Sequence, residues 1–332
     1  MHTLPAESGP IIHALAAAGK LTRAAQESLL SDHLTTKADG SEVTIADYAA
    51  QALINYLLSH SGVNIPAVIG EESSASLAAS PALLAGTVAL LRAHGWLDAT
   101  DRAVLDAIDL GAPAPGQSPP SYFTIDPIDG TKGFARGRQF AVCFARIDNG
   151  ICTFAALACP NLSRSSADSI DTPAPMGTLF VAATDTPAYS GLISRPDSLA
   201  EIPPRDAADI KNPVITFSVE PSEARLKNFD ALAATLNGAT RTPADSQAKY
   251  AMVARGQADA YFRPPRGTRE KVWDHAAGCL ILERTGCTVT DLQGRPIIWP
   301  EPSLPPCAGI LGAPPGLHAR ILAALPRVNP LQ

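Results

Sequence analysis

An Asn-Gly pair at positions 149–150 lies between two runs rich in apolar and β-branched residues, 140–148 and 151–158. Both central residues of a two-residue type I′ turn need positive φ, so Asn-Gly between strand-like runs is a strong signal for a β-hairpin. A further strand-like run, 122–125, precedes the hairpin. The middle of the chain is therefore predicted to be a β-meander.

Helical and strand-like segments alternate around this meander, and no internal repeat is visible. Apolar spacing of three and four residues predicts helices at 11–30, 45–60, 81–94, 222–236, 246–255 and from 273 or 274 to 285. Short apolar runs predict strands at 67–70, 122–125, 178–183, 214–219 and 258–262, with a polar loop between the third and fourth of these. The strand at 122–125 is expected to stop at Asp126, and Gly286 is expected to cap the last helix. This order predicts a mixed α/β arrangement of layers.

Size and charge narrow the class of protein. With 332 residues, 46% of them hydrophobic, the chain can form about two domains or one large one, at roughly 150 residues per domain. It has 26 Lys and Arg against 32 Asp and Glu, a net charge of −6, so no global positive field is available for nucleic acid or an anionic membrane. No run of about 18 apolar residues and no secretory signal is visible, so we expect a cytoplasmic protein without a membrane span.

Cysteine spacing argues against a disulfide framework and against a zinc site. The cysteines lie mostly inside apolar runs and form no CxxC pair: Cys143, Cys152, Cys159, Cys279, Cys287 and Cys307. Because free cysteine is among the most buried residue types, this pattern predicts buried, reduced thiols.

Carboxylates occur in four segments where a turn or a helix start would expose them: Asp47, Glu71-Glu72, Asp126 with Asp129, and Asp274. Taken singly, each has an ordinary explanation as a helix cap, a solvated loop, a turn former or a helix N-terminal acid. The segments contain almost no nitrogen or sulfur ligand, and an all-oxygen set favours Mg²⁺ over Zn²⁺. In the DPIDGT segment at 126–131, two carboxylates, the carbonyl of the intervening Ile and the final Thr hydroxyl can share one side.

These segments also form a recognisable set. GEES at 70–73, DPIDGTKGF at 126–134 and WDHAAG at 273–278 resemble the magnesium-dependent, lithium-sensitive phosphatase superfamily that includes inositol monophosphatase and fructose-1,6-bisphosphatase. Within it the chain is most similar to the 3'(2'),5'-bisphosphate nucleotidases, on the strength of VTIADYAAQ at 43–51, the extension TKGFARGRQFAVCFARIDNG, ACPNL at 158–162, DSQAKY at 245–250 and EKVWDHAAG at 270–278. The motifs extend from about residue 35 to residue 290.

The resemblance implies roles for individual residues. The implied ligands of two or three Mg²⁺ ions are Glu71, Asp126, the backbone carbonyl of Ile128, Asp129 and Asp274. Asp47 and Thr131 are implied to position and deprotonate the attacking water. The implied substrate contacts are Thr131, Ser246, Lys249, Arg263 and Asp274. Arg and Lys suit a nucleotide bisphosphate, because its second phosphate is not cleaved and needs a cationic partner.

The implied fold is the layered αβαβα sugar-phosphatase fold. Residues 1–160 would form an N-terminal α+β part that binds metal, and residues 161–332 a C-terminal α/β part that covers the nucleotide. One departure concerns the segment after the strand at 214–219, where relatives commonly carry a Ser-His pair that contacts the nucleotide. This chain has Pro221, Ser222 and Glu223 there, and the His is missing.

The implied activity is Mg²⁺-dependent hydrolysis of adenosine 3',5'-bisphosphate to AMP and phosphate, with 3'-phosphoadenylyl sulfate as a further substrate. This would link the chain to sulfate assimilation, and lithium sensitivity and a monomeric state are expected. The first alternative is an inositol phosphate phosphatase with the same metal chemistry. The second is a non-catalytic nucleotide sensor, which the intact Asp47 and Thr131 disfavour.

Overall fold

The turn at Asn149 and Gly150 has the predicted conformation in a computed structural model of the chain. Both residues have positive φ, 51° and 81°, and they join β5 (Ala141–Asp148) to β6 (Ile151–Cys159) as an antiparallel pair. The structure describes residues 4–28, 34–36, 42–114, 117, 119–205, 210–219, 221, 223–236, 238–265, 270–299 and 309–325.

The hairpin lies in the middle of a seven-stranded sheet in the order β3-β4-β5-β6-β7-β8-β9. The remaining strands are β3 (Val68–Gly70), β4 (Ser121–Asp129), β7 (Thr178–Ala183), β8 (Tyr189–Leu192) and β9 (Ala200–Glu201). Among the described strands of this sheet, only β3 and β4 pair in parallel. The predicted loop between residues 183 and 214 is wrong in part, because it contains β8 and β9. Neither of these short strands contains an apolar run: β9 is the edge strand of the sheet, and β8 is its neighbour.

A second sheet has five strands in the order β11-β10-β12-β14-β13. Its strands are β10 (Val214–Phe217), β11 (Thr240–Pro243), β12 (Ala260–Arg263), β13 (Thr288–Thr290) and β14 (Ile310–Ala313). Of these, β10 and β12 match predicted strands, and the other three were not predicted. A separate antiparallel pair is formed by β1 (Leu34–Thr36) and β2 (Glu42–Thr44).

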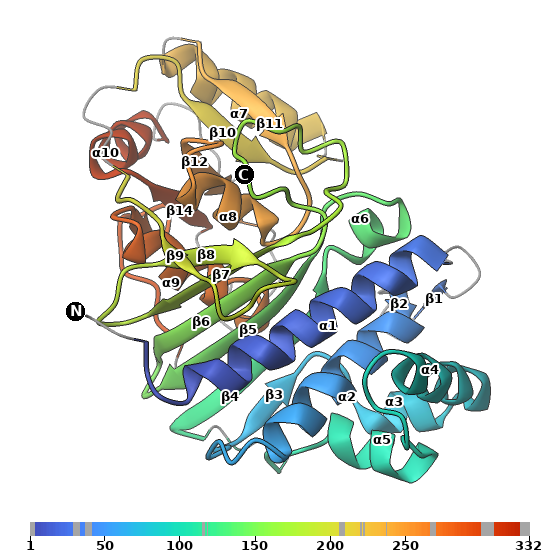
Figure 1. The fold of residues 1–332 in the computed structure, drawn as a ribbon. Coiled ribbons are helices and arrows are strands. Elements are labelled where there is room, and N and C mark those ends of the chain that lie inside the picture. Colours follow the sequence, from blue (N-terminus) through green and yellow to red (C-terminus); the bar gives the residue numbers. More distant parts are fainter. Residues whose placement is uncertain are drawn as a thin grey trace.

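The helices complete five layers in the order helix, sheet, helix, sheet, helix, which confirms the predicted fold class (Figure 1). One outer layer contains α1 (Ser8–Ser28) and α2 (Ile45–Ser59), the middle layer α8 (Ala248–Ala254) and α9 (Ala276–Arg284), and the other outer layer α7 (Glu223–Thr235) and α10 (Pro315–Ala324). Gly286, at φ 82°, follows α9 as the predicted cap. The predicted start of that helix at 273 or 274 is instead a 3₁₀ turn, η2 (Val272–Asp274).

Short helices extend the outer layer beside α2. They are α3 (Ser74–Ala78), α4 (Pro81–Ala93) and α5 (Asp101–Ile108), and only α4 was predicted. A further short helix, α6 (Thr131–Ala135), follows directly on β4. The residues Leu29 and Leu30, at the end of the predicted first helix, lie outside the described residues.

Side chains of β7 show how the first sheet is buried on both faces. Phe180 points into the core shared with α8 and α9, while its neighbours Leu179 and Val181 point into the core under α1 and α2. Alternation with a period of two therefore places apolar side chains on both faces, as expected of a sheet covered by helices on each side.

The described cysteines are buried and free, which confirms the predicted reduced thiols at Cys143, Cys152, Cys159, Cys279 and Cys287; Cys307 lies outside the described residues. Burial raises the pKa of the Cys159 thiol to about 12. These thiols are therefore protonated packing groups at neutral pH.

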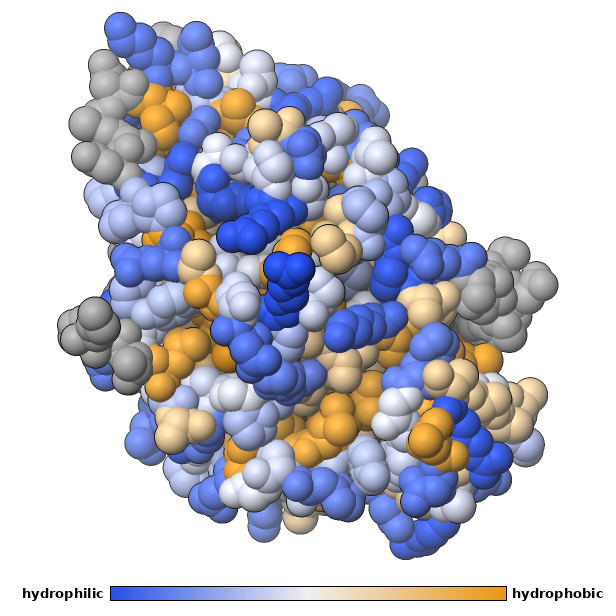
Figure 2. Space-filling model, in the orientation of Figure 1, coloured by the Kyte–Doolittle hydropathy of each residue, from blue (hydrophilic) through white to orange (hydrophobic). Residues whose placement is uncertain are grey.

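Hydrophobic and hydrophilic residues are interspersed on the face shown in Figure 2. Hydrophobic residues are more frequent in its lower half, where Figure 1 shows α1, α2 and α4. None of the helices in the described residues is long and apolar enough to cross a membrane.

Candidate active site

The carboxylates of the DPIDGT segment lie at the end of β4, which continues to Asp129. The prediction that this strand stops at Asp126 is therefore wrong. Asp126 pairs with Cys143 and Asp129 with Ala141, so three steps along β4 oppose two along β5. The extra residue of β4 creates a β-bulge. The bulge includes Pro127, which has no N–H to donate to the hydrogen bonds between the two strands. A bulge changes the direction of side chains locally, which suits a strand end that presents two carboxylates.

Gly130 makes the tight exit from this strand possible. Its φ is 90°, which disfavours other residues, and a Cβ atom built there would lie 2.9 Å from Cβ of Ser246. The helix α6 then begins at Thr131, whose hydroxyl donates a hydrogen bond to the carbonyl of Ile128 at 3.3 Å.

Glu71 reaches the same end of the sheet on the neighbouring strand. Its backbone N–H bonds the carbonyl of Ile125 at 3.1 Å, directly after the parallel pairing of β3 with β4. The buried side chain of Gln51 holds the next residue: its amide donates to the carbonyl of Glu72 at 2.9 Å and accepts from the Glu72 N–H at 3.0 Å. Asp47 precedes Gln51 by one turn of α2, so both side chains lie on one face of that helix.

The second half of the chain meets β4 through the loop before α8. Ser246 has a φ of 66°, and the following N–H, that of Gln247, donates to Oδ2 of Asp129. The Gln247 side chain donates to the carbonyl of Trp273 at 2.7 Å and accepts from the Gly278 N–H at 2.9 Å. One glutamine therefore connects Asp129 to the segment that carries Asp274.

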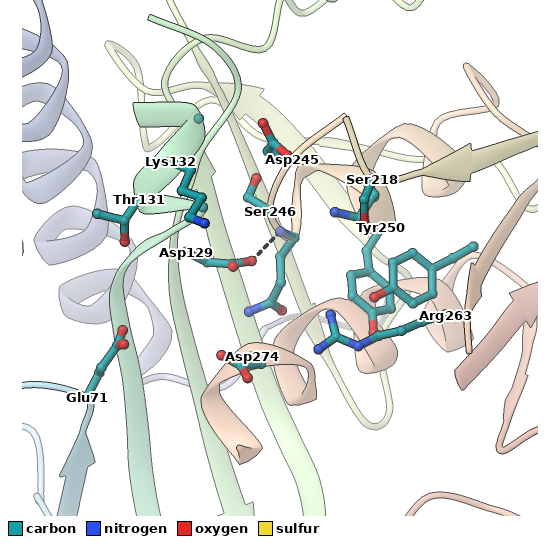
Figure 3. Close-up of a pocket in the computed structure, with 15 residues that line it drawn as sticks. Glu71, Asp129, Thr131, Lys132, Ser218, Asp245, Ser246, Tyr250, Arg263 and Asp274 are labelled. Atoms are coloured by element: carbon teal, nitrogen blue, oxygen red, sulfur yellow. Dashed lines mark hydrogen bonds between the residues drawn. The ribbon is translucent and has the colours of Figure 1, made fainter. Parts of the chain in front are cut away.

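A cavity of about 460 Å³ opens between these segments (Figure 3). The predicted site residues that line it are Glu71, Asp129, Thr131, Ser246, Lys249, Arg263 and Asp274. Figure 3 shows the carboxylates of Glu71, Asp129 and Asp274 and the guanidinium of Arg263 facing one shared space. The other predicted residues, Asp47, Asp126 and Ile128, are no more than 2% exposed and lie behind the lining.

The charges around Asp126 call for a cation. Burial, followed by the negative charges of Glu71, Asp129, Asp274 and Asp47, raises the pKa of the Asp126 carboxyl well above its usual value. Its Oδ1 atom is buried and has no hydrogen-bond partner among the described residues. A divalent cation would supply both the missing partner and the missing positive charge. The oxygen-only surroundings fit Mg²⁺, so these residues suit the expected metal.

The opposite end of the cavity is held by an ion-pair network. Arg263 donates from its NH2 group to Oε2 of Glu270 at 2.5 Å and from Nε to Oε1 at 3.3 Å. His275 lies 3.2 Å from the same carboxylate and 3.0 Å from the Tyr250 hydroxyl. Burial raises the pKa of Glu270, but the hydrogen bond with His275 and the charge of Arg263 outweigh it and lower that pKa to about 2.

Several residues of the lining were not predicted from the sequence. Lys132 follows the predicted Thr131, and Gln247 lies inside the DSQAKY motif, so both had a local signal. Tyr250 ends the same motif, whereas Tyr261, which stacks on it with ring centroids 3.9 Å apart, had no such signal, because an apolar strand position resembles core. Ser218 lines the cavity at the end of β10. Ser222, at the site of the missing Ser-His pair, lies outside the described residues.

Comparison with known proteins gives consistent matches along the whole chain. The profile of the inositol monophosphatase family matches residues 10–329. A 3'(2'),5'-bisphosphate nucleotidase from Emericella nidulans is 34% identical over 322 residues, covering 88% of this chain and 90% of the relative. The nucleotidase of the same name from Oryza sativa is 34% identical over 305 residues, covering 85% of this chain and 82% of the relative.

Solved structures agree with the fold. The extragenic suppressor protein suhB from Bartonella henselae superposes with a TM-score of 0.65 at 19% identity, covering 97% of this chain and 98% of that one. CysQ from Bacteroides thetaiotaomicron, described as a bacterial member of the inositol monophosphatase family, superposes with a TM-score of 0.60 at 20% identity, covering 94% and 99%.

Proposed function

The chain belongs to the inositol monophosphatase family, and from this premise we propose that it hydrolyses adenosine 3',5'-bisphosphate to AMP and phosphate. The relatives at 34% identity are named for this class of substrate. The single observation that carries the proposal is the charge arrangement of one cavity. Acidic groups (Glu71, Asp129, Asp274) and cationic groups (Lys249, Arg263) line the same space, so metal and a second phosphate can be held together.

Membership of the family implies dependence on a divalent metal, typically Mg²⁺. We assign its ligands to the carboxylates of Glu71, Asp126, Asp129 and Asp274 and to the carbonyl of Ile128, and we propose two or three ions. A bound Mg²⁺ would acidify water and neutralise charge on the phosphate under attack. The Oδ1 atom of Asp126, which is buried and has no hydrogen-bond partner in the described part of the chain, supports this assignment.

The chain's own residues would then handle the proton and orientation. We assign Asp47 as the group that accepts a proton from the attacking water, and Thr131 as the hydroxyl that orients it. The contact of Thr131 with the Ile128 carbonyl supports a role beside the metal ligands. Asp47 is 2% exposed, and its charge contributes to the raised pKa of Asp126, which supports a role beside that proposed ligand.

Recognition of the nucleotide falls to residues of the second half. Ser246, Lys249, Arg263 and Asp274 are the assigned contacts, and Arg263 is assigned to the phosphate that is not cleaved. We further propose the functional division at residue 160, with the metal-binding part before it and the nucleotide-covering part after it. Asp274 would serve both parts.

We also propose a biological setting that follows from the proposed activity. Removal of the 3'-phosphate from adenosine 3',5'-bisphosphate, and from 3'-phosphoadenylyl sulfate, would connect the chain to sulfate assimilation. A cytoplasmic location, a monomeric state and inhibition by lithium complete the proposal. Lithium can occupy a magnesium site while supplying too little charge.

The test is phosphate release from adenosine 3',5'-bisphosphate and inositol 1-phosphate, measured side by side with Mg²⁺, with and without Li⁺. A strong preference for the nucleotide, with loss of activity in lithium, is expected. Preference for inositol 1-phosphate would move the chain to the alternative inositol phosphatase activity. Calorimetric binding of the bisphosphate without any phosphate release would instead support a nucleotide sensor.

A further inference from the structure

A buried carboxylate lies behind the cationic end of the cavity. Glu270 is 5% exposed and is not among the residues that line the cavity. Both of its oxygens bind Arg263, at 2.5 Å and 3.3 Å, and one of them also contacts His275 at 3.2 Å. A carboxylate there would repel a phosphate. If Glu270 contributes to a phosphate-binding site, it must do so through Arg263.

The geometry of this ion pair leaves part of the guanidinium available. Arginine has five N–H donors in a planar fork, and Glu270 takes one from Nε and one from NH2. No other hydrogen bond of this guanidinium is found within the described residues. Figure 3 shows the guanidinium directed into the cavity. Glu270 therefore fixes one edge of the plane and leaves the other toward the cavity.

The same carboxylate connects Arg263 to the segment of the metal ligands. His275 follows Asp274 directly, and its second ring nitrogen lies 3.0 Å from the Tyr250 hydroxyl. The members behind Arg263 are shielded, since Glu270 is 5%, His275 is 1% and Tyr250 is 0% exposed. Buried polar networks whose members are all bonded hold their geometry rigidly. The network thus links β12, which carries Arg263, to η2, which carries Asp274.

We propose that Glu270 is a positioning residue that holds the Arg263 guanidinium at a set distance from Asp274, so that the chain selects substrates with a second phosphate. This inference rests on the proposed function. It assigns Glu270 no contact with the substrate. Its effect is to give Arg263 one orientation before the ligand binds, which spares the ordering cost of a free arginine side chain.

A metal site at the same place is a competing explanation. Side-chain atoms of Glu270, Asp274 and His275 lie within 4.8 Å of one another, as a trio of metal ligands would. The Arg263 guanidinium, however, already binds both oxygens of Glu270. A divalent cation there would face the positive charge of the Arg263 guanidinium at short range, so the ion pair is favoured.

The experiment compares the wild type with Glu270→Gln, Arg263→Ala and the double variant. Kinetics are measured with adenosine 3',5'-bisphosphate and with 3'-AMP, which lacks the second phosphate, and AMP affinity is measured by calorimetry. Glu270→Gln should raise the KM for the bisphosphate and weaken AMP binding about tenfold, by analogy with the loss of about 10–100-fold seen when the supporting partner of a metal ligand is removed. The kcat and the KM for 3'-AMP should change less than about threefold, because Glu270 acts only through Arg263.

Three control variants separate positioning from structural support. The double variant should match Arg263→Ala in AMP affinity, because Glu270 then has nothing to position. Asp259→Asn breaks the comparable Arg205–Asp259 ion pair away from the cavity, at 3.0 Å, and should lower the melting temperature without changing either KM. Glu270→Asp should recover part of the AMP affinity.

The outcomes distinguish this inference from the proposed function. Turnover of the bisphosphate by the wild type, together with unchanged AMP affinity in Glu270→Gln, would overturn the positioning role alone. Equal losses on 3'-AMP and on the bisphosphate would also overturn it, as would a Glu270→Gln protein that binds one Mg²⁺ fewer by calorimetry. A wild type that binds neither nucleotide would remove both proposals.

Discussion

The backbone N–H of Gln247 donates a hydrogen bond to Oδ2 of Asp129. Asp129 ends β4 in the first sheet, and Gln247 precedes α8 in the middle layer, so this bond joins two layers at the cavity. It holds one oxygen, Oδ2, of a carboxylate that we propose as a metal ligand. The positive φ of Ser246, 66°, is the local conformation that precedes this N–H. Such a conformation costs a non-glycine residue about 1–3 kcal/mol and is frequent at functional sites.

Asp129→Asn tests this carboxylate directly. The amide oxygen of Asn can still accept the bond from Gln247, so the fold should persist, while the ligand charge is lost. We expect kcat to fall at least about a hundredfold, since a metal ion contributes several kcal/mol and each 1.36 kcal/mol is tenfold. Melting temperature without metal should stay close to that of the wild type. Retained turnover would mean that Asp129 is not a metal ligand. The control variant is Asp98→Asn, because Asp98 is exposed.

Gln51→Ala should weaken Mg²⁺ binding without touching a ligand. The Gln51 amide holds the backbone of Glu72 through two bonds, at 2.9 and 3.0 Å, and so places Glu71. Loss of such supporting contacts typically costs about 10–100-fold in metal affinity. Calorimetric titration of Mg²⁺ into the protein measures this. Asn55→Ala is the matched control, because Asn55 lies one turn further along α2 and bonds the Ala107 carbonyl at 2.8 Å; its Mg²⁺ affinity should stay unchanged.

Periodicity and turn chemistry predicted the elements that fill the core, such as the β5–β6 hairpin, α2 and α9. They failed at β8, whose residues are mostly half-buried, and at the exposed edge strand β9, because neither short strand carries an apolar pattern. The bulge in β4 escaped prediction because a Pro inside Asp-Pro-Ile-Asp has the composition of a turn. Glu270 and His275 lie inside the EKVWDHAAG motif, but apolar spacing does not show that their partners on β12 and α8 would meet them.

Gly130→Ala should destabilise the fold more than Gly137→Ala. Both glycines have positive φ, 90° and 68°, so alanine costs about 1–2 kcal/mol at each from backbone conformation alone. At Gly130 the new Cβ would also lie 2.9 Å from Cβ of Ser246, whereas Gly137 has nothing within 4 Å. The difference between the two free energies of unfolding in urea, measured without metal, isolates this close approach. Equal losses would show that Ser246 moves freely.

Asp126→Asn should stabilise the metal-free protein, and the gain should grow with pH. The pKa of Asp126 is raised by burial and by the charges of Glu71, Asp129, Asp274 and Asp47. A pKa raised on folding stabilises the fold below the unfolded value, 3.8, and this contribution is lost as pH rises through the folded value. The neutral amide of the variant does not ionise, so the variant does not lose this stability as pH rises. Melting temperatures of both proteins in chelator from pH 5 to 8 would show a widening gap, since roughly this range lies above the unfolded pKa.

Saturating Mg²⁺ should reverse the order of the two melting temperatures, because the ion stabilises the ionised carboxylate of the wild type and binds the amide of the variant poorly. A constant gap in chelator would show that Asp126 does not carry this charge. No effect of Mg²⁺ on the gap would show that Asp126 does not bind the metal.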